Sequence, residues 1–90
     1  MEAKYSKKFL AEVDKLPLHA VKAITPLEEE LEAAKSVADI VGCKPLVGIK
    51  NAYRIRRGGY RILMTCENGV LHVRHILIRG QTYKKHNLKL

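Results

Sequence analysis

The spacing of apolar residues changes near Gly42, from a period of about 3.6 residues to a period of two. In the first half, an apolar series recurs at helical intervals over residues 5–16, and Ser6 is a suitable N-cap for it. Helical composition continues over 18–24. The stretch 25–28, Thr-Pro-Leu-Glu, then has the form of a capping box with proline at the first helical position. This pattern predicts two or three helices before Gly42.

After Gly42, three segments rich in Ile, Val, Tyr and Leu are predicted to be strands: residues 52–57, 60–66 and 70–79. Gly-Gly and Asn-Gly pairs separate these segments and are typical of tight hairpin turns. They predict an antiparallel meander, which the opening stretch 2–5 can extend as an edge strand. The predicted fold class is therefore α+β: two or three N-terminal helices packed on one face of a small curled antiparallel sheet, in one domain over residues 1–90.

The Gly58-Gly59 turn sets the register of the first hairpin. A two-residue loop puts Arg56 directly opposite Arg61. Strand alternation then gives Arg54, Arg56 and Arg61 one open face of the sheet, while the alternate apolar residues face the helices. Like charges directly opposite one another destabilise a strand pair. An anionic partner bound on this face would compensate the repulsion.

The second hairpin has two possible registers. If Asn68-Gly69 alone forms the loop, Arg61 shares its face with His72 and Arg74. If residues 67–69 form a three-residue loop with a left-handed glycine, the face instead gains Leu71, Val73, His75, Leu77 and Arg79. Ile76 and Ile78 then stay with the core. We favour the three-residue loop, because it gathers the most arginine onto one concave face.

The charge is divided unevenly between the two halves of the chain. Residues 1–41 hold six Lys or Arg and eight Asp or Glu, a net charge of −2. Residues 42–90 hold eleven basic residues against Glu67 alone, a net charge of +10. This division favours an anionic partner for the second half, nucleic acid being the commonest. On charge alone, a basic protein with no such partner remains an equal alternative.

Other features of the sequence narrow the class of protein. No apolar run approaches the roughly 18 residues of a membrane span, and the opening residues do not resemble a secretory signal. We therefore expect a cytoplasmic protein with no membrane partner. Cys43 and Cys66 lack metal-ligand spacing and are expected to be small buried thiols. His72 and His75 are three apart on a predicted strand and should face opposite ways, so we expect no metal site.

The order of several short motifs resembles the toxins of the RelE/ParE superfamily. The stretch "KPLVGIKNAYRIRRGGYRILM" is similar to their leucine-glycine turn followed by a tyrosine-arginine hairpin. A late arginine, Arg79, and a tyrosine, Tyr83, follow as they do in that superfamily. The opening "YSKKFLAEVDKLP" resembles its first helix, so the likeness covers nearly the whole chain.

The resemblance implies a fold, a partner and an activity. It implies N-terminal helices on a small antiparallel sheet, bound by a cognate antitoxin protein that neutralises the toxin. RelE-like members are ribosome-dependent endoribonucleases (mRNA interferases) that cut mRNA in the decoding site, with ribosomal RNA close by. ParE-like members instead inhibit DNA gyrase. The full arginine set and the late tyrosine favour the nuclease; a gyrase inhibitor, or a degenerate member that binds only its antitoxin, is the alternative.

The resemblance also implies roles for individual residues. Arg54 and Arg56 fall where RelE-type enzymes have paired basic residues, Arg61 and Arg79 where they hold phosphate, and Tyr83 at the C-terminal catalytic tyrosine. The expected catalytic residues are Arg56, Arg61, Arg79, Tyr83 and His86. The expected RNA-binding residues are Lys50, Arg54, Arg56, Arg57, Lys84 and Lys85.

The expected reaction is attack of an RNA 2′-hydroxyl on the adjacent phosphate. It needs a proton acceptor, stabilisation of charge on the phosphoryl oxygens, and a proton for the leaving oxygen. Guanidinium groups can supply the stabilisation, so we expect neither a metal nor a cofactor. Arginine is a poor base, which leaves Tyr83, His86 or His75 as the acid–base group.

Overall fold

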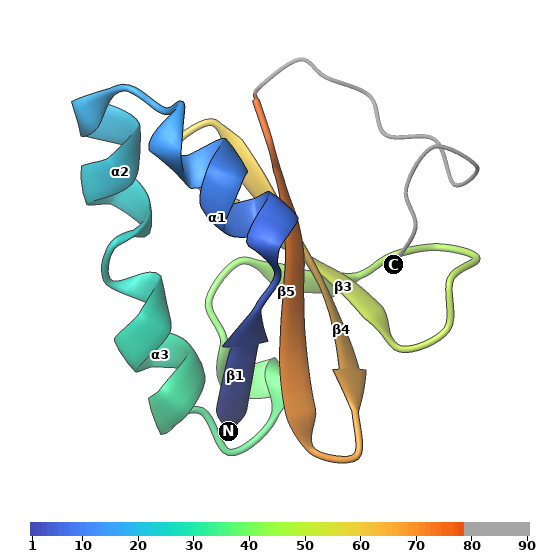
Figure 1. The fold of residues 1–90 in the computed structure, drawn as a ribbon. Helices are drawn as coiled ribbons and strands as arrows, with labels where there is room; N and C mark the ends of the chain where they lie inside the picture. The colour runs from blue at the N-terminus through green and yellow to red at the C-terminus, as the bar shows by residue number, and fades with distance from the viewer. Residues whose placement is uncertain (79–90) are drawn as a thin grey trace.

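The computed structural model describes residues 1–78. Its elements, in chain order, are β1 (Glu2–Tyr5), α1 (Lys7–Asp14), α2 (Leu18–Ile24), α3 (Leu27–Ala33), a 3-10 turn η1 (Val37–Asp39), β2 (Cys43–Pro45), β3 (Ala52–Arg57), β4 (Tyr60–Glu67) and β5 (Val70–Leu77). The three α-helices lie together on one face of the sheet (Figure 1). The predicted α+β class is confirmed.

The sheet has five strands in the order β1-β5-β4-β3-β2. Strands β3, β4 and β5 form the expected antiparallel meander and β2 extends it, but β1 runs parallel to β5, so the sheet is mixed rather than purely antiparallel. The two strands are distant in sequence, and no hairpin turn forces them to run in opposite directions. Strand β2 was not predicted, because it has only three residues and ends in a proline.

Ser6 joins the end of β1 to the start of α1. Its side-chain oxygen accepts a hydrogen bond from the Phe9 amide at 3.0 Å, which confirms the predicted N-cap. The same hydroxyl donates to the Arg74 carbonyl oxygen at 2.9 Å, and the Ser6 amide donates to the Val73 carbonyl at 3.0 Å. Ser6 therefore caps α1 and also holds the side of β5 that faces β1.

The capping box predicted at Thr25 does not form. Thr25 still has helical backbone angles at the end of α2, with φ −54° and ψ −41°. Its hydroxyl donates back to the Val21 carbonyl at 2.7 Å, as threonine side chains do inside helices. Helix α3 begins at Leu27 after Pro26, with no side-chain cap.

The main core lies between the helices and the sheet. It consists of Phe9, Ile24, Leu27, Leu31, Ala34, Ile40, Ile55, Ile62, Met64, Leu71, Val73 and Ile76. A second, smaller cluster lies on the opposite face of the sheet. It consists of Leu46, Ala52 and Leu63, with Ile49 and Leu77 packed against it. Ala52 and Leu63 belong to the strand face that also carries the arginines, so that face has an apolar patch beside the arginines. Among residues 1–78, no helix combines the length and apolar character needed to cross a membrane.

The first hairpin has the predicted register. Arg57 lies opposite Tyr60, Arg56 opposite Arg61 and Arg54 opposite Leu63. Gly58 and Gly59 both have positive φ, 55° and 99°, in a tight turn that favours glycine at both positions. The sequence therefore determines which side chains of β3 and β4 share a face.

The second hairpin starts in the register of the two-residue loop and then shifts by one residue. The loop is Asn68-Gly69 alone, since Glu67 pairs with Val70, and the favoured three-residue loop is wrong. Leu71 and Val73 accordingly lie in the main core, not beside the arginines. A β-bulge follows, because Met64 pairs with Val73 but Leu63 pairs with His75, which leaves Arg74 as the extra residue.

Beyond the bulge, His75, Ile76 and Leu77 face the sides that the favoured register had predicted, although their partners on β4 differ from that register. Leu77 pairs with Arg61 and lies on its face, whereas Ile76 pairs with Ile62 in the main core. The bulge also puts His72, opposite Thr65, and His75, opposite Leu63, on the same face of the sheet. The expected separation of these two histidines is therefore wrong.

Candidate nucleic-acid interface

The sheet face turned away from the main core carries four basic residues on three neighbouring strands. We call Lys44, Arg54, Arg56 and Arg61 the basic face. Arg56 lies directly opposite Arg61, and Lys44 lies directly opposite Arg54. Residues paired in this way share a face, with Cβ atoms about 4.5–5.5 Å apart. Two like-charged pairs thus lie next to each other in successive rows.

No ion pair within residues 1–78 involves the basic face. The carboxylates that do form pairs contact Lys4, Arg57 and His75 instead. Arg56 is exposed, and Arg54 and Arg61 are half-buried in the sheet surface. Guanidinium groups in this state keep their donors for an external oxyanion, which they bind in a planar, two-pronged geometry.

Lys44 was missed in the sequence. It belongs to β2, whose three residues carry no recognisable strand pattern, and it reaches the basic face only through the pairing of β2 with β3. A weak signal was available, since the basic residue lies close to the tyrosine-arginine stretch in sequence. Its partner could not be deduced, because the length and path of the connection over 46–51 set the register.

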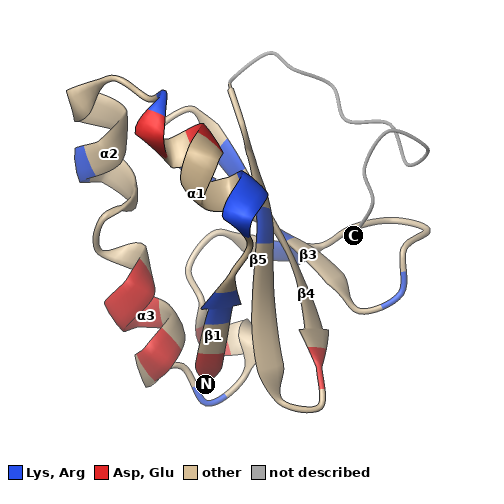
Figure 2. Ribbon diagram, in the orientation of Figure 1, with Lys and Arg blue, Asp and Glu red and all other residues tan. Residues whose placement is uncertain are grey.

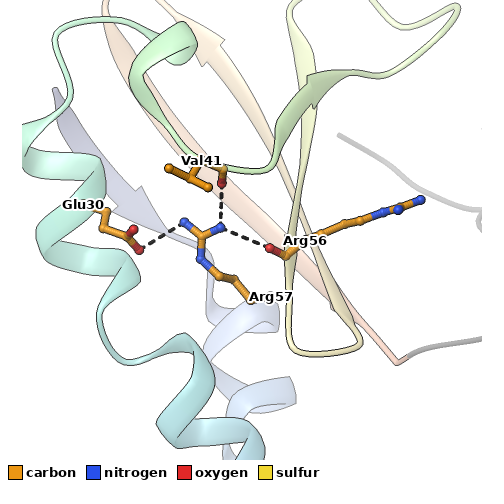
Figure 3. A network of polar contacts seen from close by, with 4 residues as sticks. All are labelled: Glu30, Val41, Arg56 and Arg57. Atoms are coloured by element: carbon orange, nitrogen blue, oxygen red, sulfur yellow. Dashed lines mark hydrogen bonds and ion pairs between the residues drawn. The ribbon is translucent and has the colours of Figure 1, made fainter.

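Arg57 lies on the other side of β3. Its guanidinium donates to the Glu30 carboxylate at 3.0 Å, the Val41 carbonyl at 2.6 Å and the Arg56 carbonyl at 3.1 Å. Figure 3 shows Arg56 extending away from this network. The Arg57 side chain is only 14% exposed. This geometry argues against the RNA contact predicted for Arg57, because its donors already hold α3 and the loop after η1.

Gly42 makes the Arg57 network possible. Its φ of 78° lies in the left-handed region, where L side chains are disfavoured. A Cβ atom there would lie 3.3 Å from Arg57 Nη1 and 3.2 Å from the Arg56 carbonyl oxygen. The glycine therefore lets the loop approach the buried guanidinium closely.

On the helix side of the molecule, α3 is strongly acidic. Helix α3 carries Glu28, Glu29 and Glu30 in its first turn and Glu32 beyond them (Figure 2). Burial raises the pKa of the Tyr5 phenol, and the nearby Glu28 and Glu32 carboxylates raise it further. The carboxylates of α3 thus lie on the opposite side of the sheet from the basic face.

Cys43 lies on the helix side of the sheet, opposite Ile55 and packed against the main core. Burial raises the pKa of its thiol, although Arg54 and Arg57 act in the opposite direction. The thiol therefore stays protonated at neutral pH and is not activated as a nucleophile. Residues 1–78 contain no group of three His, Cys, Asp or Glu residues arranged to hold a metal ion.

His75 is buried beside Glu12. Its Nδ1 lies 3.8 Å from Glu12 Oε1, and the same carboxylate oxygen accepts the Ile76 amide at 3.3 Å. At 5% exposure His75 lies within the protein rather than at the surface of the basic face. Glu12 therefore lies beside the imidazole and binds the backbone of β5 at Ile76.

The remaining predicted site residues have separate positions. Lys50 is exposed in the loop between β2 and β3. Five residues lie outside the described part of the chain: Arg79, Tyr83, Lys84, Lys85 and His86. The described structure thus brings Arg54, Arg56 and Arg61 together as predicted, adds Lys44 to them and separates Arg57 from them.

Comparison with known proteins identifies the family. No protein-family model matches the chain. The chain is 31% identical to toxin RelE3 of Methanocaldococcus jannaschii over 84 residues, which cover 92% of this chain and 96% of that protein.

Solved structures have the same fold. The RelB-RelE antitoxin-toxin complex from Methanococcus jannaschii matches with a TM-score of 0.73 and 28% identity, covering 82% of this chain and 87% of that chain. The archaeal RelE-RelB complex from Pyrococcus horikoshii matches with a TM-score of 0.71 and 20% identity, covering 90% of this chain and 97% of that chain. The chain belongs to the RelE family of toxins.

Proposed function

We propose that this protein is the toxin of a toxin–antitoxin pair and acts as a ribosome-dependent endoribonuclease that cleaves mRNA without a metal. The observation that carries the proposal is the basic face: four cations on three strands, none paired with a carboxylate within residues 1–78. Repulsion between such groups is relieved when a phosphodiester binds among them. Family membership supports the toxin assignment.

In this proposal Arg56 and Arg61 hold the scissile phosphate. The RNA 2′-oxygen attacks phosphorus and the bond to the 5′-oxygen breaks, leaving a 2′,3′-cyclic phosphate and a 5′-hydroxyl. Negative charge grows on the non-bridging oxygens during the attack, and two opposed guanidinium groups stabilise it by charge-assisted hydrogen bonds. Because the arginines stay protonated, they do not serve as the base.

Proton transfer is assigned to the C-terminal residues. Tyr83 and His86 remain our proposed acid–base groups, and Arg79 a second phosphate ligand. The burial of His75 argues against direct contact between its imidazole and the RNA. We assign His75 to the support of β5 behind the basic face, through Glu12.

The rest of the basic face binds the RNA strand next to the scissile bond. Lys44 and Arg54 form the neighbouring row, one repeat along the strands from Arg56 and Arg61. Lys50, Lys84 and Lys85 are proposed to add further phosphate contacts. Arg57 is left out of this set, because Glu30 and Val41 occupy its donors.

The proposed partner in the cell is a cognate antitoxin. The similar structures from Methanococcus jannaschii and Pyrococcus horikoshii are complexes of RelE with RelB. We propose that this chain is likewise neutralised by an antitoxin, and that it meets mRNA and ribosomal RNA in the cytoplasm. An antitoxin bound over the basic face would block the same surface that RNA needs.

The test is induction of the protein in bacteria, followed by mapping of mRNA 5′ ends with translation active and with translation blocked. We expect new 5′ ends within reading frames that disappear when translation is blocked. Arg61→Ala should abolish them at equal protein level. Intact messages together with gyrase-linked DNA breaks would overturn the nuclease assignment in favour of a gyrase inhibitor.

A further inference from the structure

A small cavity of about 150 Å³ opens where β1, the start of α1 and the bulge of β5 meet. It is lined by Lys4, Tyr5, Ser6, His72, Val73 and Arg74. Three of these residues are basic or can become so by protonation. None of the three has a place in the proposed reaction.

The backbone around this cavity is held firmly. Ser6 bonds to the carbonyl groups of Val73 and Arg74, so the bulge is tied to the N-terminus of α1. The bulge makes Arg74 the extra residue of β5. Bulges re-aim side chains and are frequent beside functional sites.

Arg74 has an unused donor in this position. Its Nε is buried and has no hydrogen-bond partner in the described structure. No ion pair within residues 1–78 involves Arg74. A buried guanidinium nitrogen without an acceptor is unfavourable, and a small rotation of this half-buried side chain would turn it to an oxyanion in the cavity.

Lys4 and His72 complete the cationic lining. They are register partners on β1 and β5, so they project to the same face. Lys4 forms an ion pair with Glu2, 4.0 Å away, and both side chains are more than 60% exposed. Such an exposed pair is weak and leaves Lys4 able to bind another anion.

We propose that this cavity binds a backbone phosphate of the same RNA strand that lies on the basic face, several nucleotides from the scissile bond. The inference rests on the proposed function. His72 pairs with Thr65 and shares the face of Arg61, so the cavity and the basic face lie on one side of the sheet. His72 lies two strand spacings from β3 and, level with Thr65, four residues along β4 from Arg61, so it is about 16 Å from Arg56. A stacked strand covers that distance with about five nucleotides at 3.4 Å each.

The test compares RNA of two lengths. Full-length protein is titrated with 2′-O-methyl RNA, which the proposed reaction cannot cleave, as a trinucleotide and as a decanucleotide. Arg74→Gln should weaken binding of the decanucleotide about tenfold at low salt and leave the trinucleotide unchanged. The slope of log affinity against log salt should fall by about 0.7 for the long RNA, as for one lost phosphate contact.

Control variants separate the possible outcomes. Lys22→Gln, an exposed change on α2, should bind both RNAs like the parent protein. Arg56→Gln should weaken binding of both lengths. If Arg74→Gln lowers the melting temperature, the double variant Lys4→Gln/His72→Gln replaces it and should show the same dependence on length.

Two results would overturn the inference. The first is unchanged binding of the decanucleotide by both cavity variants while Arg56→Gln is weakened; loss of antitoxin binding in those variants would then assign the cavity to the protein partner. The second is equal weakening of both lengths, which would make the cavity part of the scissile site. Failure of the proposed function looks different, because Arg56→Gln would then bind both RNAs like the parent protein.

Discussion

Arg56 and Arg57 are neighbours in sequence, yet they lie in opposite environments. On the helix side of the sheet, Arg57 is 14% exposed and its guanidinium lies 3.0 Å from the Glu30 carboxylate. On the other side, Arg56 is exposed and faces Arg61 across the strand pair. Both side chains carry the same charge, so the difference lies entirely in what surrounds them.

The contrast separates stability from function. Arg57 stabilises the fold by joining β3, α3 and the loop that contains Val41. The basic face has no such contacts within residues 1–78, and its cross-strand pairs lower the stability of the free protein. Residues that lower the stability of the free protein are typical of functional sites. Four variants test this contrast.

The largest effect is expected on catalysis. Replacing Arg61 by Ala should lower translation-dependent mRNA cleavage by about 10²–10³-fold, because one stabiliser of the developing phosphate charge is lost. The melting temperature should stay within about 2 °C of the parent value, since no described contact depends on Arg61. Cleavage by purified protein on ribosomes and thermal unfolding measure the two quantities. Cleavage above half of the parent rate would remove Arg61 from the site.

The second variant should lose stability but keep its cleavage activity. Arg57→Ala should lower the free energy of unfolding by about 1–2 kcal/mol, because Glu30 and the Val41 carbonyl lose their partner. Urea denaturation measures this loss. Cleavage per folded molecule should stay near the parent level. Glu30→Gln is the matched control and should cost less, since the bond to Val41 survives. A fully stable but inactive Arg57→Ala protein would return Arg57 to the RNA-binding set.

A smaller change in the free energy of unfolding, of opposite sign, is expected for a variant of the basic face. Arg56→Gln should raise the free energy of unfolding by about 0.2–1 kcal/mol at low salt, because it removes a like-charged pair. Urea unfolding repeated in about 1 M salt should show little difference, since exposed charges are then screened. A loss of stability at both salt concentrations would mean that Arg56 makes a structural contact.

The smallest effect at neutral pH is expected from Tyr5→Phe. The Tyr5 hydroxyl is buried without a hydrogen bond in the described structure, so its removal should change stability by less than about 0.5 kcal/mol. Burial, with Glu28 and Glu32, raises the folded-state pKa of Tyr5. The unfolded chain therefore loses this proton first, and stability falls as the pH rises above about 10. Tyr5→Phe should reduce that alkaline loss; melting curves across this range that match the parent protein would contradict it.

The sequence predicted which arginines share a face of the sheet, but it did not predict the surroundings of Arg57. Gly58-Gly59 fixes a two-residue turn, and alternation from that turn puts Arg54, Arg56 and Arg61 on one face. The environment of Arg57 depends on Glu30, which is 27 residues away and meets it only after α3 packs on the sheet. Local pattern carries no information about such a distant partner.

Two errors of topology have the same origin. The parallel pairing of β1 with β5 joins the two ends of the described chain, where no turn constrains direction. The bulge at Arg74 has no glycine or other local signature, so the alternation of β5 appeared to need a longer loop. Leu71 and Val73 before the bulge and Ile76 after it all lie in the main core, which the extra residue makes possible.

The bulge makes β5 one residue longer than its pairing with β4 requires. Deleting Arg74 would leave Val73, His75, Ile76 and Leu77 in unbroken alternation, with Ile76 still in the core and Leu77 still opposite Arg61. Deleting Val73 would instead move Arg74 into the core position opposite Met64. In a library of single-codon deletions, folded clones should therefore be recoverable at Arg74 and absent at Val73.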